Sequence, residues 1–280
     1  MKRVDPRVTE KFAVGGLWAC ALGTVGVLVL ILGYILAKGI WVLTPSFFVG
    51  QASDMGRAGG ILPFLVSTVV VTLVALAFGI PLGIGTAVYL AEYTNQGLVT
   101  RFIRFGVDCL AGIPSIVLGL FGFIFFVIYL DFGWSVVSGG LTVSLMIMPF
   151  IIRSSEEAIL AVPRSFREAA YAAGATKWQV VAHVVLPGAL PGIVTGVILG
   201  IGKCVGETAS VIFTAGSSLR TPISLFDSGR TLAVHFYILV REGISEKMAY
   251  GSAAVLCIAI LAINFSSYAL MRWFLRRRYS

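Results

Sequence analysis

A lysine and a glutamate stand four residues apart within one of the most apolar parts of this sequence. The stretch GVILGIGKCVGETA, residues 196–209, carries Lys203 and Glu207. A four-residue spacing places two side chains on one helix face, and each charge is costly if it stands alone at mid-membrane depth. Two interpretations remain open: an ion pair that holds helices in register, or a site where Lys203 contacts a passing anion while Glu207 sets the position and strength of its charge.

Hydroxyl side chains follow this pair in the same segment. Thr208, Ser210 and Thr214 can each donate a hydrogen bond. They can line a path for a polar substrate, or bond back to carbonyl groups of their own helix. The sequence therefore makes Lys203, Glu207 and Thr208 the candidate substrate pathway.

A nucleotide site is the other chemistry that this stretch could suggest. A phosphate-binding loop needs a glycine five residues before Gly202 and a Ser or Thr after Lys203, but Val197 and Cys204 stand there. A dinucleotide-binding glycine pattern fails at Val205 in the same way. We therefore expect a chain that binds no cofactor and is not an enzyme.

Metal and catalytic sites have little support elsewhere in the sequence. The four cysteines form no CxxC pair and have no nearby histidine cluster, which argues against disulfides and zinc. His183 and His235 are isolated, so we expect them to be structural. Asp108 lies near the expected start of a span, where it would stabilise the positive end of a helix.

The composition indicates an integral membrane protein. Of the 280 residues, 58% are hydrophobic and only 12% are charged, and the mean hydropathy is +0.96. A soluble α/β protein would need polar residues every few positions to cover its surface, and several windows have almost none. Since a bilayer is spanned by helices or by closed barrels, long apolar runs without strict alternation predict an all-α fold.

Six transmembrane helices are expected from the apolar runs. Pro81 and Pro114 fall inside them and predict kinks rather than helix ends. Thr231–Val240 is too short to span, so it is expected at the interface or in a re-entrant segment. The predicted spans are Val14–Ala37, Ile61–Ala91, Val107–Leu130, Val136–Ile152, Ala189–Ala215 and Tyr250–Phe274.

The basic residues predict how the chain is oriented. Fourteen Lys and Arg residues, Lys2 and Arg3 among them, fall in the termini and in the connections 92–106 and 153–188, against six on the other side. The side richer in Lys and Arg faces the cytoplasm, so both termini are expected there. The net charge of +8 then reflects orientation and attraction to anionic membrane lipid, and no nucleic-acid partner is needed.

The connection at about 153–188 is the longest polar-speckled segment. It is rich in Ala, Glu and Arg, with a proline at 163, a glycine at 174 and a second proline at 187. This order predicts a helix, a glycine break, a second helix and a proline stop, lying across the membrane face. An ordinary amphipathic loop and a docking surface for another protein are both compatible with that composition.

The spacing in this segment resembles the EAA signature of ATP-driven importer permeases, Glu-Ala-Ala-x3-Gly-x9-Ile-x-Leu-Pro. The chain matches it at every position except Val184, where that family usually has Ile. The resemblance implies a coupling helix that docks in a groove of a separate ATPase subunit. It places the ATPase coupling residues at the matching positions, which are Glu168, Ala169, Ala170, Gly174, Leu186 and Pro187.

Longer stretches resemble the PstA-type permease of bacterial phosphate importers, within the binding-protein-dependent transport inner-membrane component family. They are AGIPSIVLGLFG at 111–122, RSSEEAILAVPRSFREAAYAAGATKWQVV at 153–181 and LPGALPGIVTGVILGIGKCVGETASVIFTAG at 186–216. With the span count, the resemblance covers roughly residues 60–280. That family more often has Arg at the position of Lys203, which keeps the charge but offers a forked donor geometry, and Pro at the position of Ser210.

This resemblance implies a type I ABC importer permease (MetI-like) fold and an assembly in a bacterial inner membrane. Its partners would be a homologous second permease (PstC-like), two copies of an ATPase (PstB-like) that use ATP and Mg, and an external phosphate-binding protein (PstS-like). It also suggests a division into residues 1–60, which hold the N-terminal segment, first helix and external loop, and residues 61–280, the importer transmembrane domain with its coupling segment.

Three functions remain as alternatives. The first is the non-catalytic permease half of an ATP-driven phosphate importer. The second is a permease for another oxyanion such as sulfate or molybdate, which the identity of the binding protein would discriminate. The third is a membrane-embedded enzyme or channel, but Asp108, Lys203 and Glu207 are too sparse for obvious catalysis.

Overall fold

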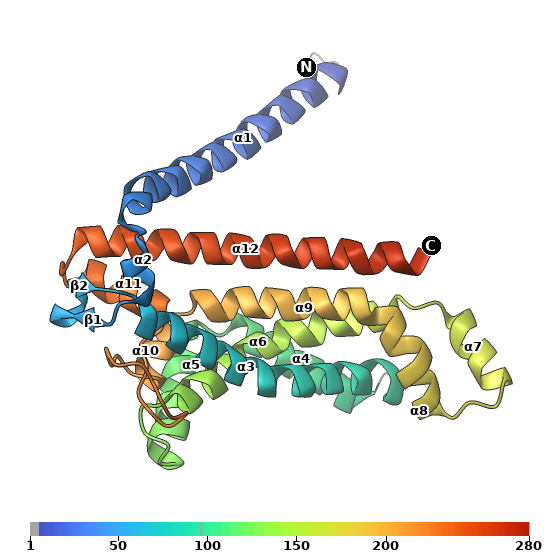
Figure 1. The fold of residues 1–280 in the computed structure, drawn as a ribbon. Helices are drawn as coiled ribbons and strands as arrows, with labels where there is room; N and C mark the ends of the chain where they lie inside the picture. Colours follow the sequence, from blue (N-terminus) through green and yellow to red (C-terminus); the bar gives the residue numbers. More distant parts are fainter. Residues whose placement is uncertain (1–5, 96, 280) are drawn as a thin grey trace.

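The computed structural model describes residues 6–95 and 97–279, and within them the chain is almost entirely helical (Figure 1). The long helices are α1 (Pro6–Gly39), α3 (Leu62–Val88), α4 (Leu98–Gly112), α6 (Val136–Leu160), α9 (Leu186–Gly206) and α12 (Glu246–Tyr279). Shorter helices are α2 (Pro45–Val49), α5 (Ser115–Gly122), α7 (Arg164–Ala172), α8 (Lys177–Val180), α10 (Ala209–Thr214) and α11 (Leu232–Arg241). A two-residue antiparallel pair, β1 (Ala52–Ser53) and β2 (Ala58–Gly59), is the sheet in this part of the chain.

Short helical segments of other pitch complete the architecture. Three have the wider π-type turn, and they continue the helices that precede them: η3 (Tyr89–Tyr93), η4 (Phe123–Tyr129) and η5 (Val181–Val185). Two have the tighter 3₁₀ turn, η1 (Ile40–Val42) and η2 (Asp54–Gly56).

Five helices of the described chain are long and apolar enough to cross a membrane, and a bent pair makes a sixth candidate. The five are Ala13–Val42, Leu62–Tyr93, Val136–Leu160, Lys177–Gly206 and Glu246–Ser266. The all-α membrane fold is thus confirmed, and Pro81 lies inside α3 without ending it. The fourth span runs eight residues further than predicted, to Leu160.

The third predicted span, Val107–Leu130, is wrong as one kinked helix. The helix α4 ends at Gly112, α5 begins at Ser115, and the two are bent by 103°. Pro114 therefore marks a helix end, because its ring cannot continue the hydrogen bonding of the preceding turn and disfavours helical backbone at Ile113, whose ψ is 129°. Beyond the bend, α5 packs against the residues 209–214, where a Cβ on Gly119 would lie 2.7 Å from the Cα of Ser210.

Helix α6 occupies the centre of the bundle, where α3 and α9 approach it closely. A Cβ on Gly79 or Gly83 of α3 would lie about 3 Å from Ile147 or Ile151, and a Cβ on Gly196 of α9 would lie 2.7 Å from Ser154. Only glycine permits these crossings, so the predicted packing role of these stripes is confirmed. Gly202 and Gly206 have no neighbour within 4 Å of such a Cβ among the described residues, so they form no close crossing within this part of the chain.

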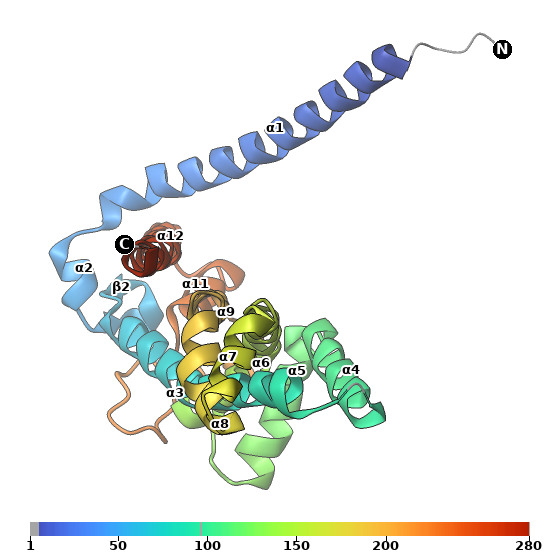
Figure 2. The same ribbon diagram turned by 90° about the vertical axis from the view of Figure 1, so that its right-hand side faces the viewer.

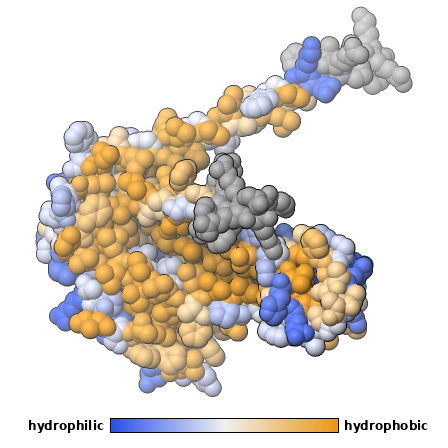
Figure 3. Space-filling view, turned by 45° about the vertical axis from the view of Figure 1, so that its right-hand side comes forward, coloured by the Kyte–Doolittle hydropathy of each residue, from blue (hydrophilic) through white to orange (hydrophobic). Residues whose placement is uncertain are grey.

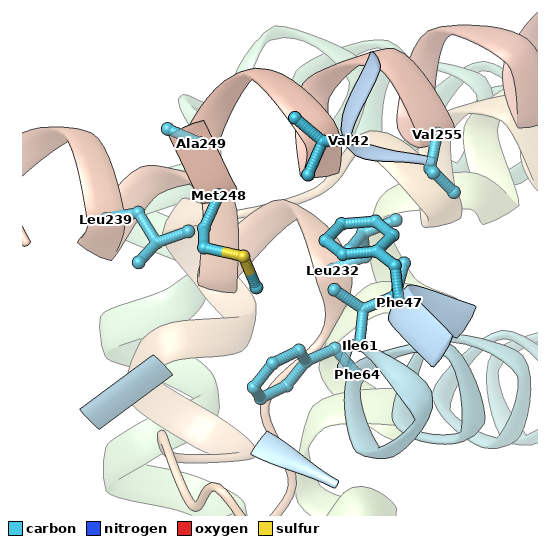
Figure 4. Close-up of a cluster of buried hydrophobic side chains, with 9 residues drawn as sticks. All are labelled: Val42, Phe47, Ile61, Phe64, Leu232, Leu239, Met248, Ala249 and Val255. Atoms are coloured by element: carbon cyan, nitrogen blue, oxygen red, sulfur yellow. The ribbon is translucent and has the colours of Figure 1, made fainter. Parts of the chain in front are cut away.

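The two ends of the bundle are built from different elements. Figure 1 places α7, α8, the first turns of α1 and the last turns of α12 toward one end, and β1, β2 and α11 toward the other. The second end has its own apolar core (Figure 4), made by Val42, Phe47, Ile61, Phe64, Leu232, Leu239, Met248, Ala249 and Val255. The short run at 231–240, predicted not to span, is helix α11 and packs into this core.

Hydrophobic side chains cover most of the face seen in Figure 3, and hydrophilic groups gather toward the two ends. Helix α1 leans away from the bundle (Figure 2), and no residue is buried in the apolar window that qualifies it as a span. It approaches α12 at Gly39, where a Cβ would clash with the carbonyl oxygen of Tyr250. Lys2 and Arg3, which supported the predicted orientation, lie outside the described residues.

Candidate functional site

The charged segment at 203–207 lies at a break in the membrane-spanning chain. The prediction of one continuous span over Ala189–Ala215 is wrong, because α9 ends at Gly206 and α10 begins at Ala209. Glu207 has extended backbone (φ −75°, ψ 130°) at this junction. Its N–H bonds to the carbonyl of Cys204 at 3.2 Å, which closes the last turn of α9.

Lys203 and Glu207 are close at this break. The Lys203 Nζ lies 3.8 Å from Glu207 Oε2, within ion-pair range but longer than a hydrogen bond. The Glu207 side chain is 5% exposed and that of Lys203 is 43% exposed. A half-exposed ammonium with three donors and one long contact can bind a further anionic group without first losing a hydrogen bond.

Glu207 also contacts the start of the next helix. Its Oε1 accepts a hydrogen bond from the N–H of Ser210 at 3.2 Å, whereas the side chain of Thr208, the residue that precedes α10, makes no capping bond. Thr214 donates back to the carbonyl of Ser210 at 2.8 Å. Thr214 therefore bonds back to its own helix, which is one of the two roles expected for the hydroxyl groups. Thr208 is half-buried beside the charged pair.

The coupling segment consists of α7, a turn at Gly174 and the helix that begins at α8. Gly174 has φ +82°, a conformation that glycine adopts without strain. Thr176 and Gln179 then form a reciprocal cap at the start of α8. The predicted helix, glycine break and second helix are confirmed. The predicted stop is wrong, because the helix continues from Lys177 to Gly206 and Pro187 lies in the first turn of α9.

A buried ion pair attaches α7 to the bundle. Arg167 donates to Glu92 of η3 through Nε at 3.0 Å and through Nη2 at 2.8 Å. It also donates to the carbonyl groups of Ile159 and Val162, at the end of α6 and just beyond it. The side chains of Arg167 and Glu92 are 14% and 9% exposed. Lys177 adds a contact with its Nζ 4.9 Å from the centre of the Tyr93 ring.

The predicted coupling residues divide into two groups. Glu168, Ala169 and Gly174 are exposed, as is Pro187 further along. Ala170 and Leu186 pack against the apolar cluster beneath α7. Large exposed side chains accompany the first group, namely Phe166, Tyr171 and Trp178. An exposed acidic and aromatic surface on a firmly attached helix is suited to contact with another protein.

A four-residue charge network joins α4 to α6, and the sequence reasoning missed it. Arg104 donates to Glu156 at 2.8 Å, and Arg153 contacts both Glu156 and Asp108. The predicted helix-start role of Asp108 is wrong, because α4 begins ten residues earlier, at Leu98. Arg153 and Glu156 are three residues apart, and this spacing, which puts them on one helix face, is the signal that could have revealed the pair.

The two histidines have different surroundings. His183 is exposed, and its Nδ1 lies 3.1 Å from the carbonyl of Gln179. His235 is fully buried and stacks on Phe64, with ring centres 3.7 Å apart. Burial and the nearby charge of Arg230 lower the pKa of His235 to about 3. Among the described residues, no group of three His, Cys, Asp or Glu side chains could hold a metal ion.

A helical bundle with one bent span, glycine-packed crossings and an exposed coupling segment is the architecture of an ABC transporter permease. The chain belongs to the family of binding-protein-dependent transport system inner membrane components, which matches residues 79–279. Its helices make it a multi-pass membrane protein. The recognition of this family from the sequence is thus confirmed.

Relatives along most of the chain agree with this assignment. The probable ABC transporter permease protein YqgI of Bacillus subtilis is 34% identical over 286 residues, which cover 96% of each chain. The phosphate transport system permease protein PstA 1 of Mycobacterium tuberculosis is 35% identical over 224 residues, which cover 79% of this chain and 73% of that protein.

Solved structures show the same fold at low identity. A chain of the inward-facing MetNI methionine ABC transporter matches with a TM-score of 0.61 and 21% identity, covering 86% of this chain and 96% of its own. A bacterial alginate ABC transporter, solved with an alginate-bound periplasmic protein, has a TM-score of 0.67 and 15% identity, covering 95% and 97%. The predicted type I importer permease fold is confirmed by these neighbours.

Proposed function

We propose that this chain is the permease subunit of an ATP-driven phosphate importer and forms half of its translocation pathway. The observation that carries the proposal is the half-exposed Lys203 ammonium, held 3.8 Å from Glu207 at the α9–α10 break. A positive charge inside a membrane protein is retained where it meets a partner or a charged cargo. Similarity to the phosphate permeases named PstA supports phosphate as that cargo.

In this function Lys203, Glu207 and Thr208 line the path of the anion. Glu207 lowers the net positive charge at the break, so that the anion is attracted without being trapped, because transport requires binding that is also readily reversed. Thr208 offers a hydroxyl donor beside the pair. The second half of the path belongs to a homologous permease (PstC-like), and a binding protein (PstS-like) delivers phosphate to the outer face.

The coupling segment is the surface for the ATPase (PstB-like), which binds and hydrolyses ATP with Mg. Glu168, Ala169 and Gly174 form the contact, since they are exposed, whereas Ala170 and Leu186 support α7 and α9 from beneath. Pro187 lies in the first turn of α9, within the span that begins at Lys177. The coupling end faces the cytoplasm of a bacterial cell, and both termini lie on that side of the inner membrane.

The test is ATP-dependent uptake of radiolabelled phosphate into proteoliposomes that contain the whole complex and its binding protein. We expect Lys203→Ala to abolish uptake while assembly and basal ATP hydrolysis persist, and Glu168→Lys to lose the ATPase subunit from the purified complex. Normal uptake by Lys203→Ala would refute the pathway assignment. Uptake of sulfate or molybdate in preference to phosphate would instead show that the cargo is a different oxyanion.

A further inference from the structure

A cleft of about 600 Å³ opens where the ends of α1, α11 and α12 meet. Its walls are mainly apolar and include Ile35 of α1, Leu239 and Val240 of α11, and Ala249 and Ala253 of α12. A volume of this size lies within the range of pockets that hold small organic molecules. Figure 1 places α11 at the end of the bundle opposite α7 and α8, so the cleft belongs to the end away from the coupling segment.

Polar groups lie beside this apolar lining, namely a pair of opposite charges and two aromatic rings. The Lys38 Nζ lies 3.3 Å from Glu246 Oε1. It also lies 5.0 Å and 4.8 Å from the ring centres of Tyr34 and Tyr250, and both tyrosines line the cleft. The side chains of Lys38 and Glu246 are 44% and 76% exposed. An ion pair that is this exposed contributes little to stability, so both charges can exchange partners at little cost.

The position of these groups along their helices sets their depth in the membrane. Lys38 is four residues from the end of the first candidate span, Ala13–Val42, and Glu246 is the first residue of the last one, Glu246–Ser266. Span ends lie where the hydrocarbon meets the lipid headgroups, and tyrosine and lysine side chains gather at that level. The apolar lining of the cleft therefore adjoins the hydrocarbon, and the charged pair lies at the level of the headgroups.

We infer that this cleft binds a zwitterionic phospholipid, phosphatidylethanolamine. One acyl chain of the lipid lies against the apolar lining, its phosphate contacts the ammonium of Lys38, and its primary ammonium contacts the carboxylate of Glu246. The two headgroup charges thus pair with two protein charges of opposite sign that already lie side by side. This assignment does not depend on the proposed function, because it concerns neither the transported anion nor the ATPase.

The carboxylate of Glu246 is the group that selects among lipids. An anionic lipid such as phosphatidylglycerol can contact Lys38, but it meets Glu246 as a like charge, which is unfavourable. A choline headgroup has no N–H to donate to the carboxylate, whereas the ethanolamine ammonium has three. The pair of charges therefore favours phosphatidylethanolamine over both alternatives.

The surroundings of the cleft favour a lipid over a protein segment as the occupant. Helix α1 leans away from the bundle (Figure 2), and no residue is buried in its apolar window. Since lipid tails are as apolar as the lining, no hydrophobic force drives a protein segment rather than an acyl chain into the cleft. The charges then decide, because their arrangement matches a zwitterionic headgroup.

Lipid retention by the purified protein tests the site. The full-length chain, with the subunits that purify with it, is mixed in detergent with equal amounts of phosphatidylethanolamine and phosphatidylglycerol and examined by native mass spectrometry. We expect wild type to retain about tenfold more phosphatidylethanolamine, the size of one hydrogen bond between charged groups. Glu246→Gln should lose this preference, because the carboxylate charge that selects the lipid is removed. Lys38→Ala should retain less of either lipid, because both phosphates lose their cation.

Two substitutions serve as matched controls. Glu242→Gln removes an exposed carboxylate four residues before Glu246, outside the lining of the cleft. Lys177→Ala removes a lysine that also lies over a tyrosine ring, that of Tyr93, but at the coupling end. Both variants should keep the wild-type preference. Because all four altered side chains are exposed, the variants should fold normally, and size-exclusion chromatography verifies this.

A photoreactive amino acid placed at Val240, which is 57% exposed and lines the cleft, locates the lipid. Irradiation in native membranes should cross-link this position to phosphatidylethanolamine, and the yield should fall about tenfold in Lys38→Ala. Cross-linking to another polypeptide would show that a protein subunit fills the cleft. Equal retention of the two lipids by wild type, or an unchanged preference in Glu246→Gln, would show binding of bulk lipid only. Any of these last results would overturn the inference.

Discussion

Two pairs of a basic residue and a carboxylate differ in how fully their hydrogen bonds are made: Arg167 of α7 with Glu92 of η3, and Lys203 with Glu207 at the α9–α10 break. Arg167 contacts Glu92 through two nitrogens and donates to two carbonyl groups as well. Lys203 has one contact at 3.8 Å and is half-exposed. Most of the N–H donors of Arg167 are used in these bonds, whereas the ammonium of Lys203 makes one long contact.

In the proposed function this difference corresponds to two roles, a structural one for Arg167 with Glu92 and a binding one for Lys203 with Glu207. A buried pair with several hydrogen bonds holds two elements in one geometry, and removing one member leaves the other charge without its partner. An incompletely paired charge that the rest of the chain does not cover can still contact a ligand. If the proposed function is right, α7 needs a rigid attachment to the bundle, and the α9–α10 break needs a charge that can exchange partners.

The largest effect should follow from breaking the satisfied pair. Arg167→Met leaves the Glu92 carboxylate buried without a partner, and removing one member of such a pair costs about 3 kcal/mol or more. We expect a marked fall in the thermal stability of the complex and loss of the ATPase subunit on purification. Adding Glu92→Gln should recover part of the stability, since no charge is then stranded. Unchanged thermal stability in Arg167→Met would contradict the structural role of the Arg167–Glu92 pair.

His235 tests what a polar side chain without hydrogen-bond partners does when it is fully buried, in contrast to the half-exposed Lys203. Both ring nitrogens are buried without a partner among the described residues, and burial with the charge of Arg230 lowers the pKa of His235 to about 3. The unfolded chain therefore binds a proton below about pH 6.5 that the folded protein does not, and stability falls as the pH falls from 6.5 toward 3.

We expect about 2 kcal/mol of destabilisation from this residue between pH 7 and pH 5. His235→Phe keeps a ring against Phe64 and should make that part of the pH dependence disappear in thermal unfolding experiments. Uptake at neutral pH should stay the same, because a sealed group cannot contact the cargo. A pH dependence that is identical in the variant would contradict this account.

A smaller effect is expected on the exposed surface of the coupling segment. Trp178 is 64% exposed, so Trp178→Ala should change stability little, but loss of an aromatic anchor at an interface weakens binding about tenfold. The measurement is ATPase affinity for the permease in detergent. Trp41, at the other end of the bundle and 85% exposed, is the matched control. Equal effects of Trp178→Ala and Trp41→Ala on ATPase affinity would show that Trp178 does not contact the ATPase.

The smallest effect should come from Lys203→Arg. The charge is kept, so uptake should stay within about twofold of wild type, although the forked guanidinium can hold both oxygens of Glu207 at once. This variant is informative because an arginine at position 203 could make several hydrogen bonds to Glu207, as Arg167 does to its own partners. A loss as severe as that of Lys203→Ala would mean that the shape of the donor matters more than its charge.

Much of the fold could be predicted from the residues because bilayer chemistry restricts long apolar runs to helices. The order of residues in the segment 153–188 predicted two helices with a break at Gly174, and the structure has that turn between α7 and α8. The bend at Ile113–Pro114 could not be predicted from the sequence, because a proline in an apolar run can either kink a helix or end it. Pro81 and Pro114 look alike in sequence, and only their packing differs.

Only part of the candidate site could be predicted from the sequence. Lys203 and Glu207 stood out because charges are rare in apolar spans. The Arg167–Glu92 pair was missed, since its members are 75 residues apart, and pairing across that distance leaves no local pattern. The break at 207–208 was missed as well, because its residues are compatible with a continuing helix.

The sequence by itself determined that this protein lies in a membrane, that it is helical and that a polar segment leaves the bilayer between two spans. These properties follow from composition and local spacing, which act within a few turns of chain. Only the tertiary structure decided where helices end, which carboxylate pairs with which base and which charge stays available. Those outcomes depend on packing between segments far apart in the chain, such as Gly119 against Ser210 and η3 beside α7.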